Sequence, residues 1–559
     1  IAHMLRLSLL LIIIILYSIR GTLLNINEIF IEWQVLDCRG NKIYLTFIFD
    51  YISFFFISVV SLISSSVFIF RVSYISSEKF YNRFFLIVMS FIFSIYMLIL
   101  RPNIIRILLG WDGLGVTSYL LVVFYQRNKS YNAGIITAIT NRLGDVGILI
   151  CIAFILFKGH WIFLTVNRDS YLSERVFILV LIVAACTKRA QIPFSAWLPA
   201  AIAAPTPVSA LVHSSTLVTA GVYLLIRFNY ILSNSSYSRI LIVIGIITIL
   251  IAGATALYEI DIKKVIALST LSQLGVIITI LGLNRPILAY FHLLRHAFFK
   301  AILFMCAGIV IHNIKDYQDI RKIRSILNNI PLVYSVIIVA NLRLCGLPFL
   351  RGFYSKDLIL EVILIKNLGI FMYIVILLAT FLTVAYSCRI IFLLSSNFRK
   401  SEAFFIVRDK DKFIITGIIY LLLLSILGGI ILSWDIIFLS FYIFIPLWAK
   451  SLITTIILSA SIFGFFVGSG KGSTLYSKKI IFLRNIWFIP ILFTITRLKI
   501  NLFSSKINIK VSERRWLEVI IFQENYYLFK KYSKYLNIIA RNYLLGSRFL
   551  ILVIILLNF

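Results

Sequence analysis

Ionisable side chains interrupt several of the longest apolar stretches in this sequence. Asp112 lies within the run Leu109-Gly-Trp-Asp-Gly-Leu-Gly-Val-Thr-Ser-Tyr, and Arg142 and Asp145 stand at i and i+3 in the next stretch. An ionisable group inside a membrane span costs about 3 kcal/mol on insertion scales, so a cluster of such groups usually marks a proton or ion pathway. The Arg142–Asp145 spacing also fits a local ion pair that only orients its helix.

A lysine beside a proline-containing break occurs twice. Lys188 ends an apolar run and precedes Gln191-Ile-Pro-Phe-Ser-Ala-Trp-Leu-Pro, and Lys356 follows Gly346-Leu-Pro-Phe. Proline removes a backbone donor, and a membrane tolerates the broken helix only where protein or a water-filled cavity satisfies the backbone. Two interrupted spans in corresponding places indicate a transporter built from inverted repeats. We expect Asp112 and Lys188 to form a switchable pair whose lysine exchanges a proton.

Histidines add a second kind of proton carrier. His213 lies in Pro205-Thr-Pro-Val-Ser-Ala-Leu-Val-His-Ser-Ser-Thr, while His292, His296 and Lys300 are spaced i, i+4, i+8 along one helix face. Groups that titrate near neutral pH and are linked by water suit a proton relay. A metal site is the alternative, but the His-x-x-x-His spacing lacks the glutamate of the zinc-protease motif and any nearby carboxylate or thiol. We therefore predict no metal here.

The composition identifies the elements that must hold these groups. The chain has 559 residues, of which 61% are apolar and 14% charged, with a formal net charge of +32. Soluble proteins carry about 25% charged residues, and apolar runs longer than about 18 residues mark membrane spans. This composition excludes a soluble enzyme, a disordered chain and a nucleic-acid-binding domain. We predict an all-α polytopic membrane protein, because β-barrel strands would read as alternating segments of about ten residues.

Apolar runs long enough to cross a membrane number about fifteen. They lie near residues 5–24, 46–70, 84–100, 103–124, 134–157, 176–197, 206–228, 239–258, 264–283, 287–312, 332–358, 367–395, 413–433, 449–468 and 543–559. The segment 471–542 is strongly basic, and its stretch Trp516–Leu545 predicts an amphipathic helix that lies along a membrane surface or a partner. A solvated basic linker is the alternative interpretation of this segment.

Short motifs that occur in order along the chain carry a family resemblance. They are Trp111-Asp-Gly-Leu-Gly, Asn141-Arg-Leu-Gly-Asp, Pro205-Thr-Pro-Val-Ser-Ala-Leu-Val-His-Ser-Ser-Thr, Asp261-Ile-Lys-Lys, Ser269-Thr-Leu-Ser-Gln-Leu-Gly, His296-Ala-Phe-Phe-Lys-Ala, Gln318-Asp-Ile-Arg-Lys and Gly352-Phe-Tyr-Ser-Lys-Asp. Together they closely resemble the antiporter-like membrane subunits of NADH:ubiquinone oxidoreductase, respiratory complex I, and in particular the mitochondrially encoded subunit 5 family. The motifs cover residues 84–395 densely.

The resemblance implies a distal, proton-pumping subunit of the membrane arm, placed in the mitochondrial inner membrane as a multi-pass protein. Expected partners are other membrane-arm subunits, including a neighbouring antiporter-like subunit, and lipids such as cardiolipin, with protons as the transported species and no nucleic acid. No cofactor is expected in this chain, because flavin mononucleotide, the iron–sulfur clusters and ubiquinone would be bound by other subunits. The chain would thus contribute to the reductase without redox chemistry of its own.

The implied architecture has two inverted five-helix repeats, each with a broken helix, and a C-terminal lateral amphipathic helix. It divides the chain into N-terminal helices (1–83), a first repeat (84–230), a second repeat (231–395), peripheral helices (396–470), a lateral basic segment (471–542) and a terminal span (543–559). The family's functional residues map onto Asp112, Arg142, Asp145, Lys188, His213, His292, His296, Lys300, Lys356 and Asp357. Asp112 stands where many members have Glu, which shortens the reach of the carboxylate.

The resemblance also implies an order of events. A remote redox reaction would shift the pairing of Asp112 with Lys188, and Lys188 would then yield its proton towards His213 and the row ending at Lys300. Release or reloading would follow at Lys356. A subunit of a sodium/proton antiporter and a purely structural membrane-arm scaffold are the alternatives. The first would not need the long lateral tail, and the second would not need titratable groups inside spans.

Part of the basic excess is open to another explanation. Arg189, Arg295, Arg343 and Arg351 lie among the motif residues, where relatives usually carry Ser, Thr or Ala, and Ile202 stands where relatives often have Met. Invertebrate mitochondria read AGA as Ser and ATA as Met, so decoding with another table would turn Ser into Arg and Met into Ile. We therefore hypothesise that several of these Arg and Ile residues are Ser and Met in the protein, and that +32 is an upper bound.

Overall fold

The computed structural model of the chain forms two compact units, Ile1–Ile489 and Pro490–Phe559. It describes residues 29–38, 41–76, 78, 80–157, 171–233, 236–314, 317–321, 323, 330–346, 351–366, 369–396, 411–437, 446–469, 478–488, 503–506, 508 and 525–539. The predicted first and last spans, 5–24 and 543–559, lie outside these described residues.

Helices of the first half follow the predicted apolar runs. They are α2 (Tyr51–Tyr74), α3 (Tyr81–Ile99), α4 (Ile104–Val122), α5 (Asn128–Phe157), α6 (Tyr171–Lys188), α7 (Trp197–Ala201), α8 (Thr206–Val208), the π-helix η2 (Ser209–Thr216), α9 (Leu217–Arg227) and α10 (Asn229–Ser233). Asp50 begins α2 with a capping box, in which its carboxylate accepts from the Ser53 amide and the Ser53 hydroxyl accepts from the Asp50 amide.

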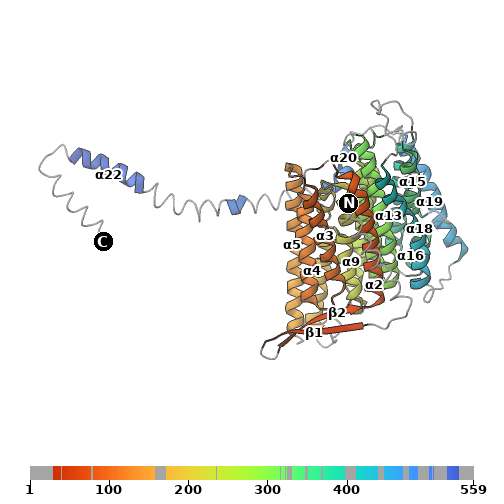
Figure 1. Ribbon diagram of the computed structural model, residues 1–559, viewed down its shortest axis with the longest axis horizontal. Helices are drawn as coiled ribbons and strands as arrows, with labels where there is room; N and C mark the ends of the chain where they lie inside the picture. The colour runs from red at the N-terminus through yellow and green to blue at the C-terminus, as the bar shows by residue number, and fades with distance from the viewer. Residues whose placement is uncertain are drawn as a thin grey trace. The chain divides into compact units, whose positions relative to one another are not determined.

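Helices of the second half continue the same bundle. They are α11 (Ser238–Tyr258), α12 (Ile262–Gly282), α13 (Pro286–Asn313), α15 (Pro331–Cys345), α16 (Arg351–Ile365), α17 (Ile370–Ser395), α18 (Lys412–Ile437), α19 (Leu447–Gly468), α20 (Lys478–Arg484) and the short η3 (Ile486–Phe488). In this unit α4 and α5 lie at one flank, α16 and α19 lie at the opposite flank, and α13 runs between them (Figure 1).

The predicted class of a multi-pass helical membrane protein is confirmed. Among the described residues, 10 helices are long and apolar enough to cross a membrane. The total of about fifteen spans and the inverted repeats remain predictions from apolar length and motif order. In the second unit, α22 (Asn525–Ile539) lies inside the stretch predicted to be an amphipathic helix, and its side chains from Tyr526 to Lys534 are exposed.

A β-hairpin precedes the first described helix, and the sequence interpretation did not predict it. Strands β1 (Ile29–Cys38) and β2 (Asn41–Phe49) pair antiparallel, with Trp33 opposite Leu45 and an irregularity between Gln34 and Leu36. The run predicted as a span from residue 46 therefore begins as a strand, because its apolar and aromatic residues suit either element until Asp50 caps the helix. The Ile48 amide donates to the Leu100 carbonyl (2.9 Å) and joins the hairpin to the end of α3.

Two helices are interrupted close to the predicted prolines. Helix α6 ends at Lys188, and Ala190 in the following segment has a φ of 56° before α7 begins at Trp197. Helix α15 ends at Cys345, and Gly346 has a φ of 77°, a conformation that glycine adopts without the steric cost of a side chain. Each break therefore lies near one of the predicted site lysines.

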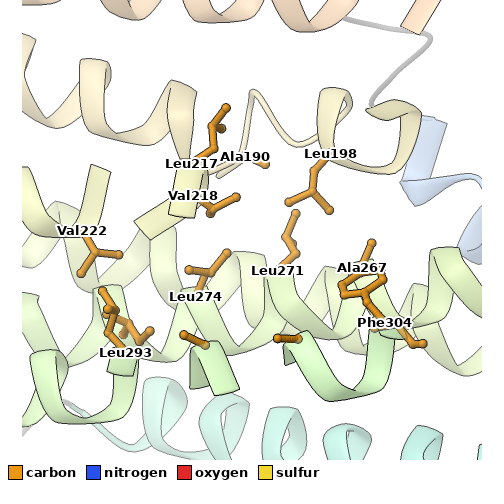
Figure 2. Close-up of a cluster of buried hydrophobic side chains, with 14 of the residues drawn as sticks. Ala190, Leu198, Leu217, Val218, Val222, Ala267, Leu271, Leu274, Leu293 and Phe304 are labelled. Atoms are coloured by element: carbon orange, nitrogen blue, oxygen red, sulfur yellow. The ribbon is translucent and has the colours of Figure 1, made fainter. Parts of the chain in front are cut away.

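Apolar side chains fill the space between the first break and the two central helices. Figure 2 shows this apolar cluster, to which the break, α7, α9, α12 and α13 contribute. The cluster's labelled members are Ala190, Leu198, Leu217, Val218, Val222, Ala267, Leu271, Leu274, Leu293 and Phe304, all of them buried. Because α12 and α13 are buried along their most apolar windows, protein or trapped water must satisfy any polar group that they carry there.

A buried polar contact fixes the end of α9. Arg227 donates to both carboxylate oxygens of Asp50, and its Nε donates to the Tyr223 hydroxyl (2.8 Å). The Tyr223 hydroxyl in turn donates to the Ile99 carbonyl (2.6 Å). These contacts join α9, and the π-helix that precedes it, to the first residue before α2 and to the last residue of α3.

Candidate functional site

Three neighbouring helices bring the first four predicted site residues into one cluster. Arg142 on α5 places Nη1 3.5 Å from Asp112 Oδ1 on α4 and 3.4 Å from Asp145 Oδ2 on its own helix. Lys188, the last residue of α6, interacts electrostatically with both carboxylates. The structure therefore assembles two acids and two cations at the first broken helix.

Within this cluster, Lys188 is completely buried and contacts the backbone of α4. Its Nζ donates to the Trp111 carbonyl (3.2 Å) and lies 5.0 Å from the centre of the Trp111 ring. Gly115 lies beside this lysine, and a Cβ at that position would stand 3.4 Å from Nζ, an ordinary contact distance. In this arrangement Arg142 makes the ion pairs with the carboxylates, and direct pairing of Asp112 with Lys188 remains a prediction.

His213 lies in the π-helix η2, apart from the cluster at Lys188. A π-helix has wider turns that leave backbone carbonyls to be satisfied, and it often occurs at functional sites. Here the Thr216 hydroxyl donates to the carbonyl of Leu211, five residues earlier (2.7 Å). The centroids of the His213 ring and the Trp197 indole lie 6.3 Å apart with the rings tilted, and that indole donates to the Thr187 carbonyl (2.8 Å). Trp197 thus contacts both His213 and the residue before Lys188.

The predicted row on α13 meets polar groups of α12. His292 Nε2 lies 3.3 Å from Gln273 Oε1, and Lys300 Nζ donates to the Ser269 hydroxyl. His292 Nδ1 lies 3.2 Å from the Ser355 hydroxyl on α16, the residue before the second site lysine. The row therefore has oxygen partners on both sides, and His292 contacts the half-helix that carries Lys356.

His296, in the middle of this row, differs from His292 in its hydrogen bonding. Its ring lies 6.4 Å from the His292 ring, and the residue is 2% exposed. Among the described residues, neither of its ring nitrogens has a hydrogen-bond partner. Buried polar groups normally have a partner, so this imidazole is suited to a bridging water.

Lys356 is held by oxygens at the second broken helix. Its Nζ donates to the Leu344 and Cys345 carbonyls (3.4 Å each) and to the Thr383 hydroxyl (2.9 Å). A Cβ on Gly346 would stand 3.2 Å from the Lys356 Cδ, so the glycine leaves room for the lysine stem. Asp357, the next residue, interacts electrostatically with Glu361 and Lys450.

The predicted site residues thus fall into four groups: the Lys188 cluster, His213, the α13 row, and Lys356 with Asp357. Sequence reasoning missed the oxygen partners Trp111, Gln273, Ser269, Ser355 and Thr383. Two of them lie in the motif Ser269-Thr-Leu-Ser-Gln-Leu-Gly, whose polar residues recur at helical spacing on an otherwise apolar helix. This helical spacing is the sequence signal from which Ser269 and Gln273 could have been predicted as partners. No group of three or more His, Cys, Asp or Glu that could hold a metal occurs among the described residues.

The arginines that the sequence hypothesis suggests are serine in the protein differ in their surroundings. Arg189 is fully buried, and none of its three guanidinium nitrogens has a hydrogen-bond partner among the described residues. Arg295 lies over the Phe291 ring at 3.9 Å, and Arg343 donates to the Ser425 hydroxyl. The side chain of Arg351 lies outside the described part of the chain. A buried guanidinium without hydrogen bonds is strongly unfavourable, which agrees with serine at position 189.

Comparison with known proteins assigns the chain to a family. Residues 102–383 match the family model described as NADH:quinone oxidoreductase/Mrp antiporter, TM, and residues 386–559 match NADH dehydrogenase subunit 5 C-terminus. Residues 36–85 match NADH-Ubiquinone oxidoreductase (complex I), chain 5 N-terminus. The NADH-ubiquinone oxidoreductase chain 5 of Aedes aegypti is 43% identical over 92% of this chain and 90% of its own length. The chain belongs to the NADH-ubiquinone oxidoreductase chain 5 family. The chain 5 of Locusta migratoria is 45% identical over 83% of this chain and 82% of its own length.

Solved structures show the same fold as this chain 5 family member at low sequence identity. A chain of the Mrp complex from Dietzia sp. DQ12-45-1b superposes with a TM-score of 0.69 at 22% identity, covering 86% of this chain and 55% of that one. A chain of the membrane-bound sulfane sulfur reductase, an archaeal respiratory membrane complex, gives 0.66 at 19% identity, covering 82% and 93%. The chain therefore has the antiporter-like fold.

Proposed function

We propose that this chain carries protons across the mitochondrial inner membrane as the distal antiporter-like subunit of the complex I membrane arm. The observation that carries the proposal is the series of two buried amines and one imidazole with oxygen partners, from Lys300 on Ser269 through His292 to Lys356 on Thr383. A structural scaffold gains nothing from these groups, because each buried cation without a full partner destabilises a membrane protein.

The local chemistry assigns a task to each part. Arg142 holds Asp112 and Asp145 beside Lys188, so a change in the field at this cluster alters how strongly the carboxylates stabilise the ammonium of Lys188. A proton released from Lys188 passes by way of His213 and water to the α13 row. His292 then passes it through the Ser355 hydroxyl towards Lys356, where the carbonyls of the broken helix hold the ammonium.

In this proposal the redox chemistry takes place in other subunits of the complex. The chain acts as a subunit of an NADH:ubiquinone reductase, and the flavin, iron–sulfur clusters and ubiquinone are bound by other subunits. Its partners are subunits of the complex, and we assign a neighbouring antiporter-like subunit to the outer face of α4 and α5. The side chain of Arg142 is 63% exposed there and that of Asp112 38%, in the middle of two spans, where lipid contact would be costly. Lipids such as cardiolipin would fill the remaining surface.

The test compares Lys188→Ala and Lys356→Ala in the assembled complex. Both variants are purified with the whole complex, reconstituted into liposomes, and assayed for NADH-driven acidification and for NADH oxidation with an uncoupler. We expect each to lower proton pumping by about a hundredfold, the usual contribution of a positioned proton-transfer group. Normal pumping in both variants would identify a scaffold, and pumping that depends on a sodium gradient would identify a sodium/proton antiporter.

A further inference from the structure

A small cavity opens beside the second site lysine. It lies between α16, α17 and α19, with Lys356 and Asp357 on one wall. Its lining residues are Gly346, Lys356, Asp357, Leu360, Thr380, Val384, Ile453 and Ile457. The cavity therefore touches the ammonium-bearing side chain and the next carboxylate at once, and a water there could carry a proton from one to the other.

An ion pair stands next to this cavity. Glu361, one helical turn beyond Asp357, is 5% exposed, and its Oε1 lies 3.5 Å from Lys450 Nζ on α19. The Lys450 side chain is 53% exposed, so the pair joins a buried carboxylate to a cation that reaches the surface. Lys450, Ile453 and Ile457 follow one face of α19 at i, i+3, i+7, which places Lys450 on the same side of the helix as the cavity wall.

We propose that Glu361 and Lys450 form the outlet gate for protons that leave Lys356. This inference rests on the proposed function, because it assigns the last transfer of the same pathway. The ammonium of Lys356 gives a proton through the cavity to the Asp357 carboxylate and becomes a neutral amine. Asp357 then returns to a carboxylate as Glu361 takes the proton, and Glu361 releases it to water when Lys450 has moved aside. When Lys450 is paired with Glu361, the carboxylate stays ionised and the outlet is closed.

The burial of the two partners explains why this pair can act as a gate. Glu361 is buried and needs a partner when ionised, so the closed state is favoured. Lys450 is the first residue of a candidate span and its side chain is about half exposed, so groups at the surface compete for its ammonium and the pair adds little stability and opens readily. A lysine stem is also long and flexible, and one end can move while the helix stays in place.

The test uses Glu361→Gln and Lys450→Ala in the whole complex reconstituted into liposomes. Two quantities are measured: NADH-driven proton pumping, and passive decay of an imposed pH gradient without NADH. We expect Glu361→Gln to lower pumping about tenfold without faster decay, because the amide cannot take the proton. We expect Lys450→Ala to accelerate the decay severalfold, because nothing closes the outlet, and Lys450→Arg to restore a slow decay.

The matched control is Lys264→Ala, which removes a half-exposed lysine that pairs with Asp261 at 2.7 Å far from the cavity lining. It should leave pumping and decay unchanged. The gate proposal would be overturned if the Glu361 and Lys450 variants lost pumping equally without a faster decay of the pH gradient. It would also be overturned if neither variant changed pumping or decay. Lys356→Ala separates the two proposals: if it pumps normally, the proposed function fails, whereas if it does not pump and the gate variants behave as wild type, only the gate fails.

Discussion

The two broken helices place a buried lysine in two different surroundings. Lys188 donates to a single backbone carbonyl and lies against an aromatic ring, with two carboxylates close by on other elements. Lys356 is within hydrogen-bond reach of two backbone carbonyls and a hydroxyl, and its neighbouring acids follow it on the same helix. The first ammonium therefore depends on carboxylates of two other helices, while the second is held by neutral oxygens.

At each of the two breaks a partly exposed cation forms an ion pair with an acid, and the two cations are of different types. Arg142 bridges Asp112 and Asp145, whereas Lys450 pairs with Glu361. Arginine stays charged and presents a rigid fork, while lysine is a single mobile charge that can lose its proton. This difference indicates that the arginine at the Lys188 break holds its two acids together, whereas the lysine at the Lys356 break can release its acid.

The largest effect is expected from Lys188→Arg and Lys356→Arg. A guanidinium keeps its proton, so we expect both variants to lower NADH-driven pumping in liposomes by about a hundredfold or more. Lys264→Arg is the control for a lysine outside the pathway. If Lys188→Arg pumped normally while Lys356→Arg did not, Lys188 would act only through its charge, and the two ends would differ in kind.

A smaller effect is expected from alanine at the glycine beside each lysine. Gly346→Ala forces a side chain into the left-handed region and should destabilise the chain by about 1–2 kcal/mol. Gly115→Ala adds only an ordinary contact, 3.4 Å from Lys188 Nζ, on a regular helix that favours alanine. Thermal inactivation of the purified complex measures both. Equal sensitivity at the two positions would show that the break at Gly346 is not strained by a side chain.

A weaker effect is expected from Arg142→Lys. One ammonium cannot hold two carboxylates as a guanidinium does, but the two ion pairs of Arg142 are long, at 3.5 Å and 3.4 Å, so each contributes only modestly. A loss of about 1 kcal/mol corresponds to about a fivefold loss of pumping. The pumping assay in liposomes measures it, with Arg142→Gln expected to lose more. No difference between the two substitutions would mean that the charge at 142 has no role.

The prediction with the smallest functional effect is the identity of residue 189. Serine is expected in the natural protein, because a fully buried guanidinium that has no hydrogen-bond partner in the described part of the chain would add a second positive charge directly after Lys188. Peptide mass spectrometry of the purified subunit reads the residue directly. A peptide mass that requires arginine would contradict the hypothesis and would leave Lys188 with a charged neighbour.

The spans and breaks could be predicted from sequence because they depend on local properties. Apolar run length located α11, α12 and α13, and proline with glycine located the breaks beside Lys188 and Lys356. Residues 46–49 of the hairpin were predicted as the start of a membrane helix because their β-branched and aromatic side chains suit either element, and no element was predicted for residues 29–45.

The partners of the site residues could not be predicted, because they depend on which helices pack together. The Ser355 hydroxyl meets His292 across α16 and α13, and the Thr383 hydroxyl meets Lys356 across α17 and α16. Serine and threonine are common in apolar helices, where their hydroxyls bond to the preceding turn, so neither residue type signals such a contact. Sequence spacing predicted the ionisable residues, and only the packing revealed the oxygens between them.

The apolar cluster between the first break and the central helices has a consequence for energy storage. A continuous file of water through Leu217, Leu274 and Leu293 would conduct protons back down the gradient whenever the enzyme rests. Each proton that returns across 100 mV dissipates about 2.3 kcal/mol. On the proposed pathway, a dry layer of leucine and valine blocks such a file of water. The branched side chains of this layer would therefore act as an electrical insulator within the resting subunit.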